Sequence, residues 1–189
     1  MSPKQFLACI LGAAALSAAA APEPPRVLIA PVQVAFDKNW LPDMNSSRGR
    51  TDRVNAQDVG RIAADMAASL QAALAEAVRA RGFEVVSAPA PGVVRLSATI
   101  QDLYVNAPEG HSPGLSKTFV REAGRATLRA EGRDAASGAV RLQTERSATA
   151  GDTGRLERAT DVSNSFWFDA MFRNWAREVA NELHSQPAH

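Results

Sequence analysis

Cysteine and histidine are both scarce in this sequence. Cys9 is the single cysteine among 189 residues, and it lies inside an N-terminal leader. A mature chain without that leader has no thiol, so disulfides, thiol nucleophiles and cysteine-ligated zinc are not expected. The three histidines include only one, His111, away from the C-terminus, and no serine occupies a G-x-S-x-G turn beside it. A serine hydrolase is therefore not indicated.

Cofactor and metal motifs are missing as well. Neither G-x-x-x-x-G-K-[ST] nor G-x-G-x-x-G follows an expected strand, and no EF-hand or H-E-x-x-H pattern occurs. Carboxylates and a histidine do share loops, but without metal-ligand spacing; they are Asp37, Asp43, Asp52, Glu109 and His111. The formal net charge is +1, and leaving out Lys4 of the leader balances basic and acidic residues. We predict no cofactor, no metal and no nucleic-acid partner.

The first 20 residues predict a cleavable signal peptide. Lys4 provides the positive start, an apolar stretch runs from Phe6 to Leu16, and Ala18-Ala19-Ala20 fits the A-x-A cleavage rule. The apolar stretch ends near Ala21, so no transmembrane span is expected after cleavage. Cys9 lies too early in the apolar stretch to be the modified cysteine of a lipoprotein. We expect a periplasmic or secreted protein with one domain over residues 21–189.

Two amphipathic helices are predicted at positions 55–81 and from Ser163 onward. Asn55 can cap the first helix, and Gly82 can end it in the left-handed conformation. Apolar residues recur every three or four positions in both segments, which predicts one buried stripe on each helix. The stripes comprise Val59, Ile62, Met66, Leu70, Leu74 and Val78 in the first helix, and Phe168, Met171, Phe172, Trp175, Val179 and Leu183 in the second.

Strands are predicted between and before these helices. In residues 26–36, apolar side chains occur at both odd and even positions, so both faces of the strand would be buried, which is typical of a central strand. Residues 83–87 are predicted to form a short strand. In the strand 93–105 the parity changes after Ile100, which predicts a bulge near Gln101 or Asp102. Two further alternating segments flank a hairpin turn at 134–138. The order β-α-β-β-β-β-α predicts an α+β two-layer sandwich, with a largely antiparallel sheet and both helices on one face.

Several short segments also resemble an uncharacterised family of bacterial envelope proteins, often described as lipoproteins. They are Phe36-Asp37-Lys38-Asn39-Trp40, Val94-Arg95-Leu96, the segment from Asp102 to Pro108, the hairpin Asp134 to Gly138, and Asn164 with Trp175-Ala176. None of them is a catalytic signature. The resemblance covers nearly all of the mature chain and implies an envelope location and an α/β sandwich. It brings no reaction with it, and the early position of Cys9 departs from the lipoprotein members.

The best binding candidates lie in the long polar loop 37–54, a length typical of functional or mobile segments. Its arginines 48, 50 and 53 could bind an anionic lipid headgroup or an acidic protein face, with Trp40 beside them. On the final helix, Trp167 falls toward the edge of the buried stripe and is a candidate aromatic anchor. We therefore name Trp40, Arg48, Arg50, Arg53 and Trp167 as candidate partner-binding residues.

The favoured function is a non-enzymatic accessory role, in which the exported protein binds an envelope protein partner. Two alternatives remain. A small-ligand carrier would need an apolar pocket between sheet and helices. A hydrolase would need two carboxyls close together, for instance Asp102 with Glu109 or Glu131. The oligomeric state stays open, although an unpaired sheet edge could allow a homodimer.

Overall fold

A computed structural model describes residues 23–46, 48–50, 52–106, 119–151, 157–158 and 161–185 of the chain. Its helices are α1 (Trp40–Ser46), α2 (Ala56–Ala80) and α3 (Asp161–Ser185). Its strands are β1 (Arg26–Ile29), β2 (Gln33–Phe36), β3 (Glu84–Val85), β4 (Val93–Val105), β5 (Phe119–Val120), β6 (Gly124–Asp134), β7 (Val140–Ala150) and β8 (Glu157–Arg158). The expected signal peptide, Cys9, Glu109 and His111 lie outside the described residues.

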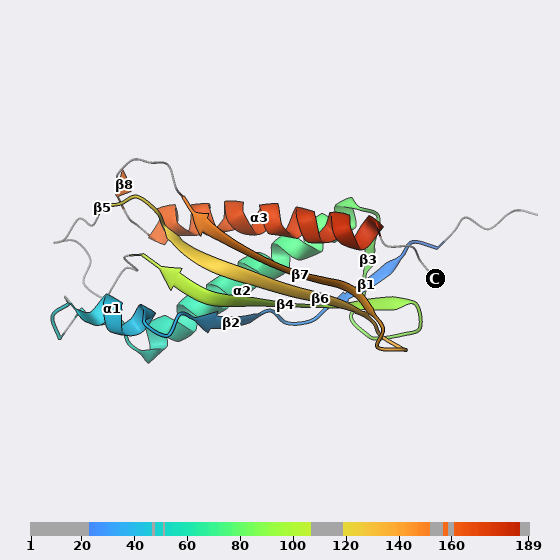
Figure 1. Cartoon of the computed structure of the whole chain (residues 1–189), viewed down its shortest axis with the longest axis horizontal. Coiled ribbons are helices and arrows are strands. Elements are labelled where there is room, and N and C mark those ends of the chain that lie inside the picture. The colour runs from blue at the N-terminus through green and yellow to red at the C-terminus, as the bar shows by residue number, and fades with distance from the viewer. Residues whose placement is uncertain are drawn as a thin grey trace, which may run out of the picture.

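The main sheet has six strands in the order β3-β1-β4-β6-β7, and β2 also pairs with β4 (Figure 1). The two longest pairings, β4 with β6 and β6 with β7, are antiparallel. By contrast, β1 and β2 run parallel to β4, and β3 runs parallel to β1. The α+β class is confirmed, and the sheet is largely antiparallel, as predicted, with a smaller parallel part formed by β1, β2 and β3. The parallel part arises because α2 carries the chain back along the sheet between β2 and β3.

The first strand was predicted as one segment over residues 26–36, and the structure divides it in two. Pro31 cannot donate a backbone hydrogen bond, and the chain leaves the ladder there. The Val32 N–H instead binds the side-chain oxygen of Gln71 on α2, at 3.1 Å. Both halves nevertheless pair with the same strand, β4, so they remain in one line along the sheet.

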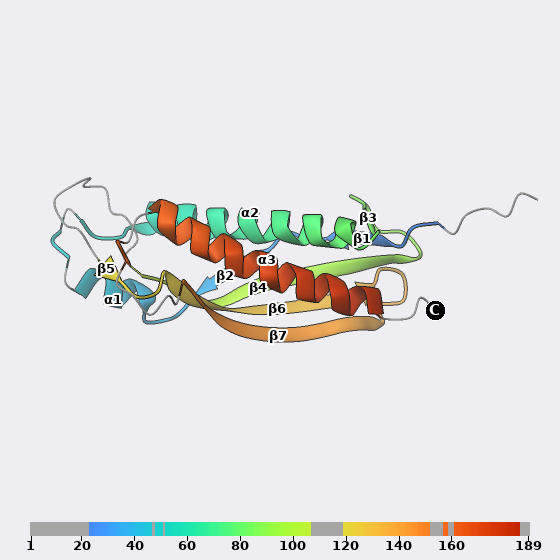
Figure 2. The ribbon, with the colours of Figure 1, turned by 90° about the horizontal axis from the view of Figure 1, so that it is seen from above.

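Helices α2 and α3 lie side by side on one face of the sheet (Figure 2). Their predicted stripes form the core together with the inward side chains of the strands. The predicted ends of α2 are confirmed: Asn55 caps it in a capping box with Asp58, and Gly82 follows it with φ +83°. The start of α3 was predicted at Ser163, but the helix begins at Asp161 and Ser163 falls in its first turn.

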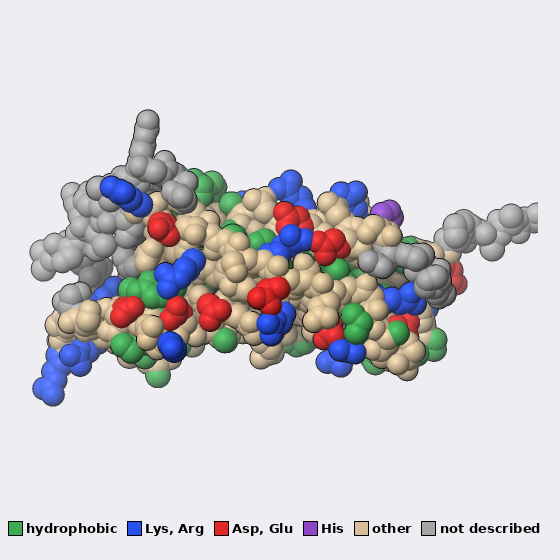
Figure 3. Space-filling view, in the orientation of Figure 1, with side chains coloured by type: hydrophobic (Ala, Val, Ile, Leu, Met, Phe, Trp, Pro, Cys, Tyr) green, Lys and Arg blue, Asp and Glu red, His purple; other side chains and the backbone are tan. Residues whose placement is uncertain are grey.

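The other face of the sheet is polar. Side chains of β6 and β7 pair across it, as in the ion pair between Arg129 and Glu145 at 2.7 Å. Charged side chains of both signs are spread along this face (Figure 3). The hairpin between the two strands is confirmed, with Gly138 at φ +72°. A sheet that is apolar on one side and charged on the other needs only one helical layer, which accounts for the two-layer architecture.

The predicted loop 37–54 is not entirely a loop. Residues 40–46 form α1, which packs beside the end of β4 at one end of the molecule (Figure 1). The predicted bulge in β4 is confirmed at that same end, where the register with β6 shifts between Gln101 and Tyr104 and Asp102 has φ +50°.

Candidate functional site

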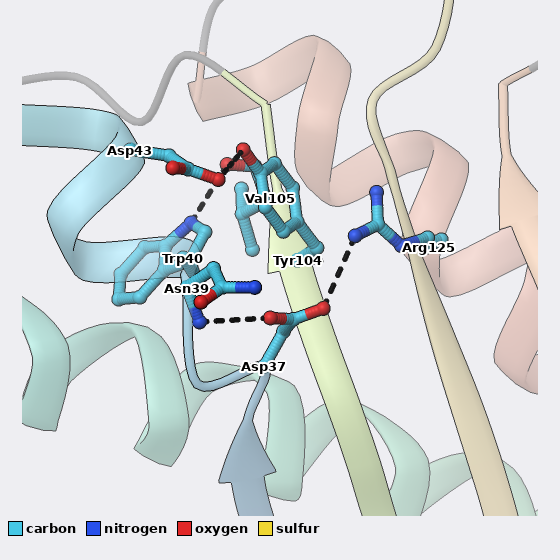
Figure 4. Close-up of polar contacts among 7 residues, drawn as sticks. All are labelled: Asp37, Asn39, Trp40, Asp43, Tyr104, Val105 and Arg125. Carbon is cyan, nitrogen blue, oxygen red and sulfur yellow. Dashed lines mark hydrogen bonds and ion pairs between the residues drawn. The ribbon is translucent and has the colours of Figure 1, made fainter. Parts of the chain in front are cut away.

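The candidate site lies where α1 packs against the bulged end of β4. We call it the α1 clasp, and it consists of Asp37, Asn39, Trp40, Asp43, Tyr104, Val105 and Arg125 (Figure 4). These residues come from the turn after β2, from α1, from β4 and from β6. Segments more than 60 residues apart in the sequence therefore meet at one place.

Trp40 is the buried anchor of the clasp. Its side chain is 1% exposed, and its indole Nε1–H donates a hydrogen bond to the Val105 carbonyl oxygen at 2.9 Å. The ring stacks on Phe36, with centroids 4.3 Å apart and planes inclined by 17°. The structure thus places this candidate partner-binding residue in the core. Burial is favourable here because the ring has apolar neighbours and the indole N–H has a carbonyl acceptor.

Asp37 connects the turn before α1 to the sheet. Its Oδ1 accepts the backbone N–H of Asn39 at 2.9 Å, and its Oδ2 accepts a hydrogen bond from the guanidinium of Arg125 at 3.1 Å. The pKa of Asp37 is lowered from its ordinary value of 3.8, chiefly by the backbone hydrogen bond from Asn39 and also by Arg125. The carboxylate is therefore a fixed acceptor rather than a proton donor near neutral pH.

Tyr104 forms the outer wall of the clasp. Its hydroxyl donates to Oδ2 of Asp43 on α1 at 3.0 Å, and the guanidinium carbon of Arg125 lies 4.2 Å from its ring centroid. Burial raises the pKa of Tyr104, and its hydrogen bond to Asp43 adds to the effect. Asp37, Tyr104 and Arg125 are thus linked to one another or to α1, and these contacts fasten α1 to the sheet.

The lowered pKa of Asp37 predicts an acid-sensitive contribution to stability. A carboxylate whose pKa falls on folding stabilises the protein fully above its unfolded pKa, near 3.9, and loses this as pH drops through the lowered folded value. We expect Asp37→Asn to be less stable than the parent chain between pH 5 and 7, with the difference shrinking below about pH 4. Urea unfolding followed by circular dichroism from pH 2.5 to 7 measures this, and a difference independent of pH would contradict it.

The bulge at Asp102 sets the direction of the side chains that follow it. After it, Leu103 points into the core with 0% exposure, and Tyr104 faces the clasp. The structure does not bring the two carboxyls of the hydrolase hypothesis together. Glu131 pairs with Ser97 in the sheet register, five residues before Asp102, which corresponds to about 16 Å along the strand. Glu109, the other suggested partner, is not among the described residues.

The three arginines after α1 have different surroundings. Arg48 is half-buried and donates to the Asp52 carbonyl oxygen at 3.3 Å, whereas Arg50 and Arg53 are exposed. Leu41, the residue after the buried tryptophan, is 38% exposed on α1. Nothing in the local sequence shows which of these two adjacent apolar residues enters the core.

Trp167 is half-buried rather than free. It packs against the core and also against Gly151. The approach is so close that a Cβ atom added at Gly151 would lie 2.7 Å from the Trp167 ring. The adjacent Phe166 is the exposed aromatic residue, at 57%, and its ring meets that of Trp167 edge-on at 5.1 Å. The sequence pattern placed Trp167 at the edge of the helical stripe, and the tertiary packing decides that its neighbour Phe166 faces solvent.

A surface cavity of about 360 Å³ lies between α2 and α3. Its lining residues are Ala73, Glu76, Ala77, Ala170, Arg173, Asn174 and Arg177. It is not the apolar pocket between sheet and helices that a ligand carrier would need. In the part of the chain that the structure describes, no three His, Cys, Asp or Glu side chains form a group suited to a metal ion. No described helix combines the length and apolar character needed to cross a bilayer.

Segments on which the family resemblance rests meet in and beside the clasp. The stretch from Phe36 to Trp40 faces the end of β4, and the side chain of Asn164 on α3 donates to the Asn106 carbonyl oxygen at 3.1 Å. Asn164 is only 4% exposed, so this bond satisfies a buried amide. The Asn106 side chain in turn donates to the Glu122 carbonyl oxygen at 2.9 Å.

Comparisons with known proteins agree with this coverage. A family model described as "Protein of unknown function (DUF3313)" matches residues 23–179. Among curated protein sequences, none matches this chain.

Three solved structures illustrate the similarity in shape. The PelC dodecamer from Paraburkholderia phytofirmans has 14% identity and a TM-score of 0.44, covering 87% of this chain and 90% of that one. The hypothetical protein CT253 from Chlamydia trachomatis has 12% identity and a TM-score of 0.45, covering 87% and 98%. A minor lipoprotein from Acinetobacter baumannii has 9% identity and a TM-score of 0.41, covering 85% and 94%. At these TM-scores the similarities carry no conclusion about function.

Proposed function

The chain belongs to the DUF3313 family of proteins of unknown function, and we propose that it is an exported, non-enzymatic envelope protein that binds a protein partner. The observation that carries this proposal is the gathering of exposed apolar and basic side chains at one end of the molecule. We call this surface the α1 end, and it consists of Leu41, Arg50, Arg53 and Phe166.

Exposed apolar side chains are unevenly distributed over the described residues. Three large hydrophobic side chains are exposed, and two of them, Leu41 and Phe166, belong to α1 and to the start of α3. These two helical segments lie at the same end of the molecule, whereas the third, Val140, lies at the opposite end beside the β6–β7 hairpin (Figure 1). Apolar side chains that gather on an exposed surface mark interaction sites more often than scattered ones do.

Basic side chains accompany them. Arg50 and Arg53 are exposed and form no hydrogen bond or ion pair with another described residue. Arginine is enriched at protein interfaces because its planar guanidinium can bind carboxylates through two hydrogen bonds and can stack on rings. An acidic, partly apolar face on a partner protein would match this surface.

The α1 clasp holds in place the part of this surface that α1 contributes. Trp40 and Asp43 on α1 are bonded to β4, so the helix that presents Leu41 is held to the sheet. A surface that is already ordered loses little conformational entropy when a partner binds. The predicted leader and the family resemblance support the envelope location, and the hydrogen bonds that hold α1 to the sheet support a role in binding.

The proposal is tested by replacing the two exposed arginines. We expect Arg50→Ser/Arg53→Ser to lower recovery of a crosslinked partner from the periplasm by about tenfold or more, because interface arginines each contribute on the order of 1–2 kcal/mol. Mass spectrometry of the crosslinked material identifies the partner, and the intact mass of the periplasmic protein checks that the leader is removed.

A matched control keeps the number of arginines removed the same. Arg79→Ser/Arg81→Ser changes two exposed arginines at the end of α2, away from the α1 end. This control should retain the partner. Equal recovery with both variants, each folded by circular dichroism, would refute the proposed role of the α1 end.

A further inference from the structure

Helices α2 and α3 form a second exposed surface, separate from the α1 end. They run in the same direction (Figure 2). A hydrogen bond between Ser69 on α2 and Asp169 on α3 shows which residues of the two helices lie at the same level along their axes. Each helix has 25 residues, which is about 37 Å of length. Their sheet-facing stripes are buried, and no described element covers the opposite side of this layer.

The cavity between these helices has a small apolar floor and charged rims. Ala73 and Ala77 are both 8% exposed and lie at its base. Glu76 stands on the α2 rim, and Arg173 and Arg177 stand one helical turn apart on the α3 rim. The side chains of Glu76 and Arg173 are exposed, and neither pairs with another described residue.

Charges of opposite sign thus face each other across one groove at the same height. Consider a two-fold axis that runs along the groove, parallel to the helices. It would place α2 of one copy over α3 of the other, and each residue would keep its position along the helix direction. Glu76 would then meet Arg173 and Arg177 of the second copy, and the same contact would form twice. Such a patch is complementary to itself, as an isologous dimer interface requires.

We infer that a second copy of this chain packs on the α2–α3 face, with its Glu76 against Arg173 and Arg177 of the first. The alanine floor favours this occupant, because small side chains let two layers of helices approach closely. A small ligand is less favoured, because an open cavity with charged rims would leave most of its surface exposed. A layer of two helices is about 20 Å wide, so this face offers about 750 Å² per copy. The total of about 1,500 Å² is close to the usual size of a stable protein interface.

Charge reversal tests the inference without disturbing the core, because Glu76 and Arg173 are both exposed. Sedimentation velocity at about 100 µM and low salt should show a dimer for the parent chain. Glu76→Arg alone and Arg173→Glu alone should each weaken dimerisation by about tenfold or more, since two like-charged contacts replace two attractive ones. The triple variant Glu76→Arg/Arg173→Glu/Arg177→Glu restores opposite charges across the axis and should recover the dimer.

The outcomes separate the possible occupants. A parent chain that stays monomeric overturns the inference and leaves the face to a ligand or to a different protein. Dimers that neither single reversal weakens show that copies meet on another surface, such as the edge strand β7, and overturn it as well. Circular dichroism of each variant confirms folding. Because Arg50 and Arg53 are untouched, loss of the dimer leaves the partner-binding proposal independently testable.

Discussion

Replacing Trp40 by alanine is expected to lower the free energy of unfolding by about 3–5 kcal/mol. The side chain is 1% exposed, and truncation leaves a cavity beside Phe36 and removes a hydrogen bond. The Val105 carbonyl oxygen loses its indole donor in a buried position, which adds to the cost. Since folded domains have about 5–15 kcal/mol in total, the loss is a large share of stability.

Urea unfolding measured by circular dichroism tests the Trp40 prediction. In a chain of this size the melting temperature should also fall by about 10 °C. Trp40→Phe keeps a ring on Phe36 but not the indole donor, so about 1–2 kcal/mol should be lost. The matched control is Leu41→Ala, whose exposed side chain should change stability by about 0.5 kcal/mol or less. Equal effects at positions 40 and 41 would contradict the burial of Trp40.

Introducing a methyl group at Gly124 is expected to be nearly as damaging. A Cβ at this first residue of β6 would lie 2.1 Å from the Tyr104 carbonyl oxygen and 2.8 Å from Cζ of Phe168. The nearest atom is backbone, so β4 and β6 must move apart where they pair beside the bulge. We expect Gly124→Ala to cost about 3 kcal/mol. The shift should also loosen the α1 clasp, because Tyr104 and Arg125 flank the contact.

Gly60→Ala provides a control in which the same substitution should raise stability instead of lowering it. Gly60 lies in the interior of α2, and a Cβ there would meet nothing within 4 Å. Alanine is the better helix former by about 0.5–1 kcal/mol, so this variant should be more stable than the parent chain. Thermal and urea unfolding of both variants measure the pair. Stabilisation by Gly124→Ala would show that β4 and β6 are not so close at this point.

The candidate site was only partly predictable. The arginines at 50 and 53 were selected from local sequence and are exposed, whereas Trp40 was placed beside them and is buried. The difference is physical, because burial of an aromatic ring in a short helix depends on what packs over it. Here the cover is Phe36 and the end of β4, and the acceptor of the indole hydrogen bond lies 65 residues away.

Local periodicity and capping chemistry determined much of the fold. The stripes of α2 and α3, the Asn55 cap, the bulge after Gln101 and the turn at Gly138 each depend on neighbouring residues, and all were predicted. Only the tertiary structure decided that the first strand divides at Pro31 and that its two halves run parallel to β4. Strand direction and the position of α1 depend on contacts between distant segments, and those contacts leave no periodic signal in either segment alone.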